Sequence, residues 1–469
     1  MRENPAHWKL ISFVLFLFLV GCAPAGTPAQ PIDGNELATI VAATLTAITS
    51  DNNAPPPAAT EAPGMPTEAS SPDEPAYTPP RALQVAYIKD GNVYIWTEGE
   101  NSVGLTNTGD AIQVSISDDG QIIAYERRDP NNYFTSELWA VNTSGSTNAR
   151  ALVSQAEMDS LKAASSYSNA MGMSIDLLKW RPKTHEVYYS TVPVFEGPGY
   201  MPGEDVRMIN LNTMEKRTIF DYGQGGKFYF SPDGGQVALS TPDHISLSNA
   251  DGSNLRANVL TFPLVGTFSE YQYHPVPVWA GDSGSLRVTI PPEDTMAQPT
   301  PPTGLWQIPT DGSPAVQMGS IPAIPFAWPD NAFSPNLDRV AYAKSAGEPG
   351  TNQLELHVAN ADGSGDYTFI AGGSLVFVTW TPDGTRFVYL LESDSDHMMY
   401  LGTLATGNVF NIASDASTVQ QMRWVDNSRF LFFFQNGDVR ELRISDVDGT
   451  NHAFIDTIAD STVGYDFSK

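Results

Sequence analysis

Residues 231–253, with the sequence SPDGGQVALSTPDHISLSNADGS, contain the pattern that decides the fold. Two Asp-Gly turns, Ser231-Pro232-Asp233-Gly234 and Ala250-Asp251-Gly252-Ser253, enclose short runs that include apolar and β-branched residues. Gly accepts a positive φ and Asp hydrogen-bonds to its own backbone, so both residues favour tight turns. Short runs of this kind, bounded by turns, are typical of strands in an all-β fold.

This unit recurs along the chain from Leu83 onwards. The first turn returns as Ser117-Asp118-Asp119-Gly120 and Thr381-Pro382-Asp383-Gly384, and altered copies lie near residues 181, 281, 334 and 425. The second turn returns near residues 310, 361 and 447. The period of about fifty residues predicts the four-stranded blades of a β-propeller.

The Ser/Thr-Pro-Asp-Gly turns resemble the WD40-like PD40 repeats of TolB propellers and of the propeller domains of prolyl-oligopeptidase-family proteins. The resemblance covers residues 83–469. It implies a TolB-type propeller without the hydrolase domain, because no segment of hydrolase size follows the last repeat.

The number of blades follows from the two ends of this domain. Seven first-strand units lie near residues 117, 181, 231, 281, 334, 381 and 425. The domain begins with three strands that lack a first strand, and residues 463–468 end it as a lone strand. If the last strand pairs with the first three, the ring has eight blades and no open edge. Seven blades remain the alternative if one altered unit is an excursion from the ring.

The N-terminus has the features of a bacterial export signal. Arg2 and Lys9 form a positively charged start and precede an apolar stretch, Leu10–Val20, and the segment ends in Leu19-Val20-Gly21-Cys22. This ending resembles the lipobox of bacterial lipoproteins, which implies a signal peptide at residues 1–21 and a lipid attached to Cys22. We therefore expect a membrane-anchored protein on the extracytoplasmic side, in the periplasm or at the cell surface. An ordinary signal peptide or a short membrane anchor is the alternative.

Residues 22–82 are predicted to form a tether rich in Pro, Ala and Thr. Nine prolines occur between residues 51 and 80, and such a segment cannot bury enough apolar surface to fold. Within it, residues 35–48 place apolar side chains at helical spacing, so a short helix is expected there, either docked or without a partner.

Composition excludes several classes of protein. The 469 residues include 53 Asp and Glu, 25 Lys and Arg and one Cys, and the net charge is -28. An acidic surface repels phosphate backbones, so we expect no nucleic-acid partner. One Cys excludes an intramolecular disulfide and a zinc site built from several thiolates.

The connections between strands differ on the two predicted faces. Those from strand one to two and from three to four are short and share one face, and most of the long ones share the other. We call these the short-turn face and the long-loop face. The long-loop face is the expected binding surface for a protein or glycan. Its candidate residues could instead pack their own loops; they are Tyr133, Phe134, Tyr167, Phe195, Tyr200, Tyr271, Tyr273 and His274.

No catalytic motif stands out. The sequence has no Gly-x-Ser-x-Gly elbow and no His-x-x-x-His spacing, so we expect a non-catalytic binding scaffold without a cofactor. Asp446 and Asp448 partly resemble a calcium loop but lack the distal Glu, and a plain turn explains them as well. The alternatives are a glycosidase- or sialidase-like propeller enzyme, and an accessory subunit of a separate peptidase or transporter.

Overall fold

The computed structural model describes residues 82–469 except 145–148, 166, 168, 197–204, 268–271, 298, 300, 325–331, 347–352, 393–396, 450–451 and 460–462. The expected signal peptide, Cys22, the tether up to residue 81 and the helix at 35–48 lie outside the described residues. Within the described part of the chain, no helix is long and apolar enough to span a membrane.

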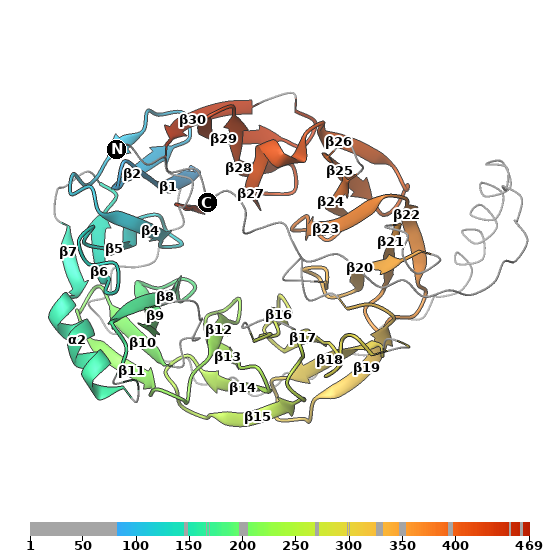
Figure 1. Ribbon diagram of the computed structural model, residues 1–469, viewed down its shortest axis with the longest axis horizontal. Helices are drawn as coiled ribbons and strands as arrows, with labels where there is room; N and C mark the ends of the chain where they lie inside the picture. Colours follow the sequence, from blue (N-terminus) through green and yellow to red (C-terminus); the bar gives the residue numbers. More distant parts are fainter. Residues whose placement is uncertain are drawn as a thin grey trace, which may run out of the picture. The chain divides into compact units, whose positions relative to one another are not determined.

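The described residues form a β-propeller of eight antiparallel sheets (Figure 1). Blade 1 combines the C-terminal strand with three N-terminal strands, in the order β31 (Tyr465–Ser468), β1 (Gln84–Lys89), β2 (Asn92–Thr97) and β3 (Val103–Gly104). Since β31 pairs with β1 over Gln84 to Tyr87, the ring is closed as the sequence predicts. The count of eight blades is confirmed and the alternative of seven is excluded.

Blades 2 to 4 follow in chain order. Blade 2 consists of β4 (Ala111–Ile116), β5 (Ile122–Arg127), β6 (Glu137–Asn142) and β7 (Arg150–Val153). Blade 3 consists of β8 (Gly172–Trp180), β9 (Glu186–Val194), β10 (Val206–Asn210) and β11 (Lys216–Phe220). Blade 4 consists of β12 (Lys227–Phe230), β13 (Gln236–Ser240), β14 (His244–Asn249) and β15 (Arg256–Thr261).

Blades 5 to 8 complete the ring. Blade 5 consists of β16 (Val278–Trp279), β17 (Ser285–Ile290), β18 (Thr303–Pro309) and β19 (Val316–Ile321). Blade 6 consists of β20 (Arg339–Ser345), β21 (Leu354–Asn360) and β22 (Tyr367–Ala371), and a bridge from Phe333 to Val340 takes the first-strand position. Blade 7 consists of β23 (Ser374–Trp380), β24 (Arg386–Glu392), β25 (His397–Thr403) and β26 (Val409–Ala413). Blade 8 consists of β27 (Val419–Trp424), β28 (Arg429–Asn436), β29 (Val439–Asp446) and β30 (His452–Ile458).

The second strands supply much of the core between blades. Tyr87, Tyr125, Tyr188, Tyr342 and Tyr389 occupy second strands of five blades, and each is less than 3 % exposed. Their hydroxyls can reach across to a neighbouring blade: Tyr87 donates to Asp456 at 2.7 Å and Tyr188 donates to the Ala250 carbonyl at 3.1 Å. The repeated apolar run after each first turn therefore packs one blade on the next.

The outermost strands have irregular pairing that disfavours the addition of another strand. In blades 2 to 8, the ladder between the third and fourth strand has a register shift. Bulges of this kind twist an exposed edge and make it a poor template for another chain.

The turns keep one geometry even where the repeat is altered. Gly120, Gly234 and Gly384 have φ between 65° and 73°, and Ser283 and Leu337 adopt φ of 60° at the same turn position. The altered copies near residues 281 and 334 are therefore blades of the ring, although L-residues are strained in this conformation.

The long connections lie on the face opposite these turns. They are residues 128–136, 154–171, 195–205, 262–277, 291–302 and 346–353. Helix α2 (Gln155–Ala164) lies in the second of them and begins with a capping box between Ser154 and Glu157. A 3₁₀ turn, η1 (Ala416–Thr418), precedes blade 8.

Candidate functional site

Polar side chains on the short-turn face form hydrogen bonds within their own turns. In the first turn of blade 7, the Thr381 hydroxyl donates to Asp383 at 2.7 Å and accepts from the Arg386 N–H at 3.1 Å. Burial alone would raise the pKa of Asp383, but hydrogen bonds from Thr381 and Thr385 outweigh it and hold that pKa below its usual range. Much of the acidic composition is thus explained by turns.

Neighbouring first turns are also bonded to each other. The Lys183 N–H donates to Asp118 Oδ2 at 2.8 Å, and His185 Nε2 lies 2.7 Å from Asp119 Oδ2, which joins blade 3 to blade 2. Between blades 7 and 8, the Asp383 N–H donates to Asn427 Oδ1 at 3.0 Å. These bonds give the acidic side chains a role in holding blades together.

The aromatic residues predicted for the long-loop face lie in several places. Tyr133 is 68 % exposed, whereas Phe134 is half-buried. Tyr167 packs edge-on against Phe195 at 5.9 Å and against Tyr222 at 5.7 Å between ring centroids. Tyr167 therefore contacts rings from two other connections.

Tyr273 and His274 lie in the connection between blades 4 and 5. Tyr273 is half-buried, with its hydroxyl 3.5 Å from the Thr289 carbonyl. His274 is buried, and this burial lowers its pKa to about 4, so the ring is neutral at neutral pH. Tyr200 and Tyr271 lie outside the described residues. A binding role for any of the eight residues stays a prediction.

The structure adds exposed apolar residues that the sequence reading missed. Leu264 and Met296 are each 57 % exposed, and Met171 is 48 % exposed. All three lie in long-loop connections, as does Tyr133. Other exposed apolar residues, such as Val316 and Phe454, lie on outermost strands. Aliphatic residues in loops went unnoticed because the sequence search for binding residues considered aromatic and polar groups.

The loops that carry Leu264 and Met296 are fixed to each other. The Gly266 N–H donates to the Glu293 carbonyl, and the Thr295 hydroxyl donates to the Gly266 carbonyl, both at 2.8 Å. The two apolar side chains are therefore presented from a braced pair of loops rather than from independent ones.

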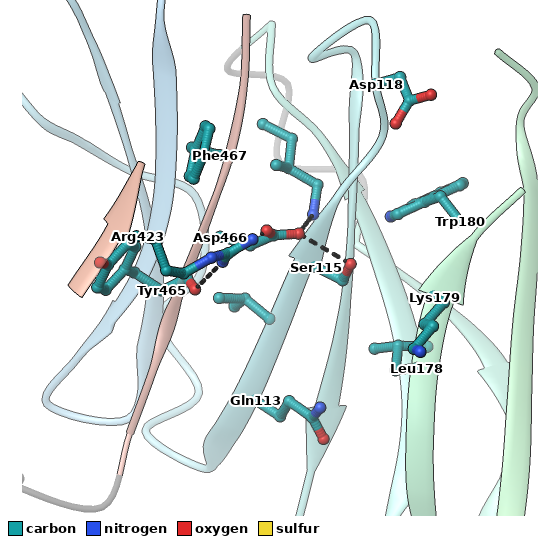
Figure 2. Close-up of a pocket in the computed structure, with 12 residues that line it drawn as sticks. Gln113, Ser115, Asp118, Leu178, Lys179, Trp180, Arg423, Tyr465, Asp466 and Phe467 are labelled. Carbon is teal, nitrogen blue, oxygen red and sulfur yellow. Dashed lines mark hydrogen bonds and ion pairs between the residues drawn. The ribbon is translucent and has the colours of Figure 1, made fainter. Parts of the chain in front are cut away.

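A cavity of about 510 Å³ lies in the central channel (Figure 2). It is lined by innermost strands of blades 8, 1, 2 and 3 and by the turn after β4. Its lining consists of Gln113, Val114, Ser115, Ile116, Asp118, Leu178, Lys179, Trp180, Arg423, Tyr465, Asp466 and Phe467. Most of these residues belong to the strand ends that lead into first turns, so the cavity lies in the half of the channel nearer the short-turn face.

Asp466 is the most strongly engaged group in this cavity. Its Oδ2 accepts from the Ser115 hydroxyl and the Ile116 N–H, both at 3.0 Å, and its Oδ1 accepts from Arg423 Nη1 at 2.9 Å (Figure 2). The carboxylate thereby ties blade 1 to blades 2 and 8. Both oxygens are occupied, which makes Asp466 a poor candidate for a nucleophile.

Two further side chains, Asp118 and Lys179, contribute charge to the cavity. Burial raises the pKa of Asp118, and the nearby charges of Asp466 and Asp119 add to this. Lys179 donates to the Phe228 carbonyl at 2.9 Å and lies 4.2 Å from the ring of Tyr229. Two cationic side chains and two carboxylates therefore share the lining.

Among the described residues, no group of three or more His, Cys, Asp or Glu side chains is arranged to hold a metal ion. Asp446 and Asp448 flank the turn between β29 and β30, where the Gly449 N–H donates to the Asp446 carbonyl at 3.0 Å. This geometry is that of the repeated turn.

No protein-family model matches the chain. A segment of 70 residues, 15 % of the chain, is 34 % identical to the Tol-Pal system protein TolB of Methylococcus capsulatus, and it spans only 16 % of that protein. This match and the turn repeats support the TolB-type PD40 propeller that the sequence resembles.

Solved structures with similar folds include two TolB proteins and a lyase. Putative TolB from Agrobacterium tumefaciens is 14 % identical over 55 % of this chain and 90 % of its own, with a TM-score of 0.34. TolB from Acinetobacter baumannii is 14 % identical over 76 % of this chain and 82 % of its own, also at 0.34. Oligogalacturonate lyase from Vibrio parahaemolyticus is 10 % identical over 80 % of this chain and 84 % of its own, with a TM-score of 0.42. At these scores the similarities carry no argument about function.

Proposed function

We propose that this chain is a non-catalytic lipoprotein of the bacterial envelope whose propeller binds a protein partner through the long-loop face. The observation that carries the proposal is the exposed apolar pair Leu264 and Met296 on braced loops. Loops whose backbone is already fixed lose little conformational freedom on binding, so the apolar side chains that they carry suit a partner surface. The short-turn face instead uses its polar groups to hold turns and blades together.

Photo-crosslinking from single positions tests the binding face. A photoreactive amino acid at position 264 or 296 of the full-length protein should capture a partner in the envelope. The matched control is position 255, because Leu255 is 46 % exposed in blade 4, which the loop with Leu264 follows, but belongs to a short turn. Capture from position 255 alone, or from none of the three positions, would contradict the proposal.

The lipid anchor has a separate test. Cys22→Ser should abolish incorporation of labelled palmitate and either release the protein from the membrane fraction or leave it unprocessed. Membrane retention after signal cleavage in this variant would rule out lipid anchoring. The crosslinks alone would then decide whether the long-loop face binds a partner.

A further inference from the structure

An arginine begins the second strand in blades 6, 7 and 8. These residues are Arg339, Arg386 and Arg429. The Arg386 guanidinium donates to the Asn427 carbonyl of blade 8. Arg429 forms an ion pair with Glu98 of blade 1 at 2.7 Å. In blades 7 and 8, the arginine at this position therefore reaches the next blade of the ring.

In blade 6 the arginine remains within its own blade. Arg339 is half-buried, and its guanidinium donates to Asn360 Oδ1 at the end of β21. Among the described residues, this guanidinium makes no ion pair with a carboxylate and no hydrogen bond to blade 7. Its charge and several of its N–H groups are therefore open to a ligand.

A groove of about 620 Å³ lies beside Arg339, between blades 6 and 7, which are neighbours in the ring (Figure 1). It is on the short-turn face, because the turns of both blades and the strand ends next to them form its walls. Its lining consists of Asn336, Asp338, Arg339, Ala359, Asn360, Gly365, Tyr367, Gly384, Thr385, Thr403, Leu404 and Ala405. This volume is in the range of small-molecule sites.

The groove combines hydrogen-bond donors with apolar surface. Tyr367 is 45 % exposed; partial burial raises the pKa of its hydroxyl, and the charge of Arg339 acts against this rise. The phenol and the guanidinium are thus close enough to interact, and both can donate to an anion. Leu404 and Ala405 add aliphatic surface from the second turn of blade 7. A carboxylate attached to an apolar group matches this lining.

One carboxylate in the lining limits the charge of such a ligand. Asp338 Oδ1 accepts from the Ser334 hydroxyl at 2.9 Å. Burial lowers the pKa of Arg287 in blade 5, and the charge of Asp338 acts against this, so these two side chains attract each other. Arg339 can therefore attract one negative charge, whereas Asp338 repels any further one.

We propose that this groove binds a monocarboxylate that carries an apolar group, with Arg339 donating to the carboxylate and Leu404 and Ala405 contacting the apolar group. Guanidinium groups donate two parallel hydrogen bonds to a carboxylate, and such charge-assisted bonds are stronger than neutral ones. A free acid and the C-terminus of a peptide share this chemistry. The site does not depend on the partner proposed for the long-loop face.

Saturation-transfer NMR with the full-length protein in detergent tests the site. N-acetyl-leucine represents a free acid, and N-acetyl-alanyl-alanyl-leucine represents a peptide C-terminus. N-acetyl-leucine amide is the control without a carboxylate, and citrate is the control with several carboxylates and no apolar group. Arg339→Gln removes the charge in the groove. Arg386→Gln is its matched control, because Arg386 holds the same position in the repeat and bonds to blade 8.

We expect at least one of the two leucine acids to bind at millimolar concentration, and the one that binds more tightly identifies the source of the carboxylate. The amide should bind about tenfold more weakly, because a hydrogen bond to a charged group is lost. Arg339→Gln should weaken binding of the acid by a similar factor, and Arg386→Gln should leave it unchanged.

Three results would overturn the proposal. They are equal binding of N-acetyl-leucine and its amide, binding of citrate without binding of either leucine acid, and absence of binding by both leucine acids. The comparison of acid with amide uses the unaltered protein, so it holds even if Arg339→Gln unfolds the chain. Equal loss of binding in the two folded variants would also contradict the role of Arg339.

Discussion

Asp466→Asn tests whether closure of the ring depends on this carboxylate. Asp466 accepts from Ser115 and Ile116 with one oxygen and from Arg423 with the other. An Asn side chain has the same shape but carries one NH₂ group. In either orientation of the amide, that NH₂ group faces a donor. The variant therefore loses either the bonds from Ser115 and Ile116 or the bond from Arg423.

The expected cost follows from the environment of each contact. The Asp466 side chain is only 19 % exposed, and a lost hydrogen bond to a charged group costs about 1.5–3 kcal/mol. The Arg423 side chain is 45 % exposed and can be solvated, so the ion pair adds about 0.5 kcal/mol. We expect the free energy of unfolding to fall by about 2–3 kcal/mol and Tm to fall by about 5 °C.

Urea unfolding followed by circular dichroism measures this cost, and hydrogen exchange across Tyr465–Ser468 shows whether β31 is loosened. The matched control is Asp438→Asn, because Asp438 is exposed in the short connection between β28 and β29 and should change stability by less than about 0.5 kcal/mol. If Asp466→Asn changes stability no more than this control and leaves the hydrogen exchange of β31 unchanged, the proposed dependence of ring closure on the Asp466 carboxylate is refuted.

Three further predictions concern pH and loop packing. Burial lowers the pKa of His274 to about 4. As the pH falls from 6.5 to 4, the unfolded chain therefore takes up a proton before the folded chain does, and about 3 kcal/mol of stability is lost. His274→Gln should flatten this pH dependence in urea unfolding, and an unchanged slope would contradict it. Burial would raise the pKa of Asp426, but hydrogen bonds within its turn outweigh it and lower that pKa to about 2; the stabilisation is present above pH 4 and lost toward pH 2. Since this side chain is 37 % exposed, screening leaves about 1 kcal/mol, which Asp426→Asn should cost at pH 7 but not at pH 2 in the same assay. Gly172→Ala would place a Cβ 2.0 Å from the Phe134 carbonyl oxygen, and it should cost about 1–3 kcal/mol and speed proteolysis of residues 128–136, whereas Gly281→Ala, with open space around it, should do neither.

The sequence predicted the architecture because the propeller is built from local signals. Asp-Gly turns depend on a few adjacent residues, and the same turn at a regular period fixes the strands between them. The lone last strand and the three unpaired first strands gave the blade count, since a closed ring leaves no inner edge unpaired. The altered copies obscured the repeat, yet Ser283 and Leu337 keep the turn geometry.

The candidate sites depended on contacts that no local pattern encodes. Asp466 meets Ser115 across 351 residues of chain, and Gly266 meets Thr295 only because two loops cross on one face. In four blades a tryptophan ends the first strand, namely Trp180, Trp279, Trp380 and Trp424, so the sequence cannot distinguish these indoles. Trp279 and Trp380 donate to a carbonyl at the first-strand position of the preceding blade and the other two do not, a difference that exists only in the assembled ring.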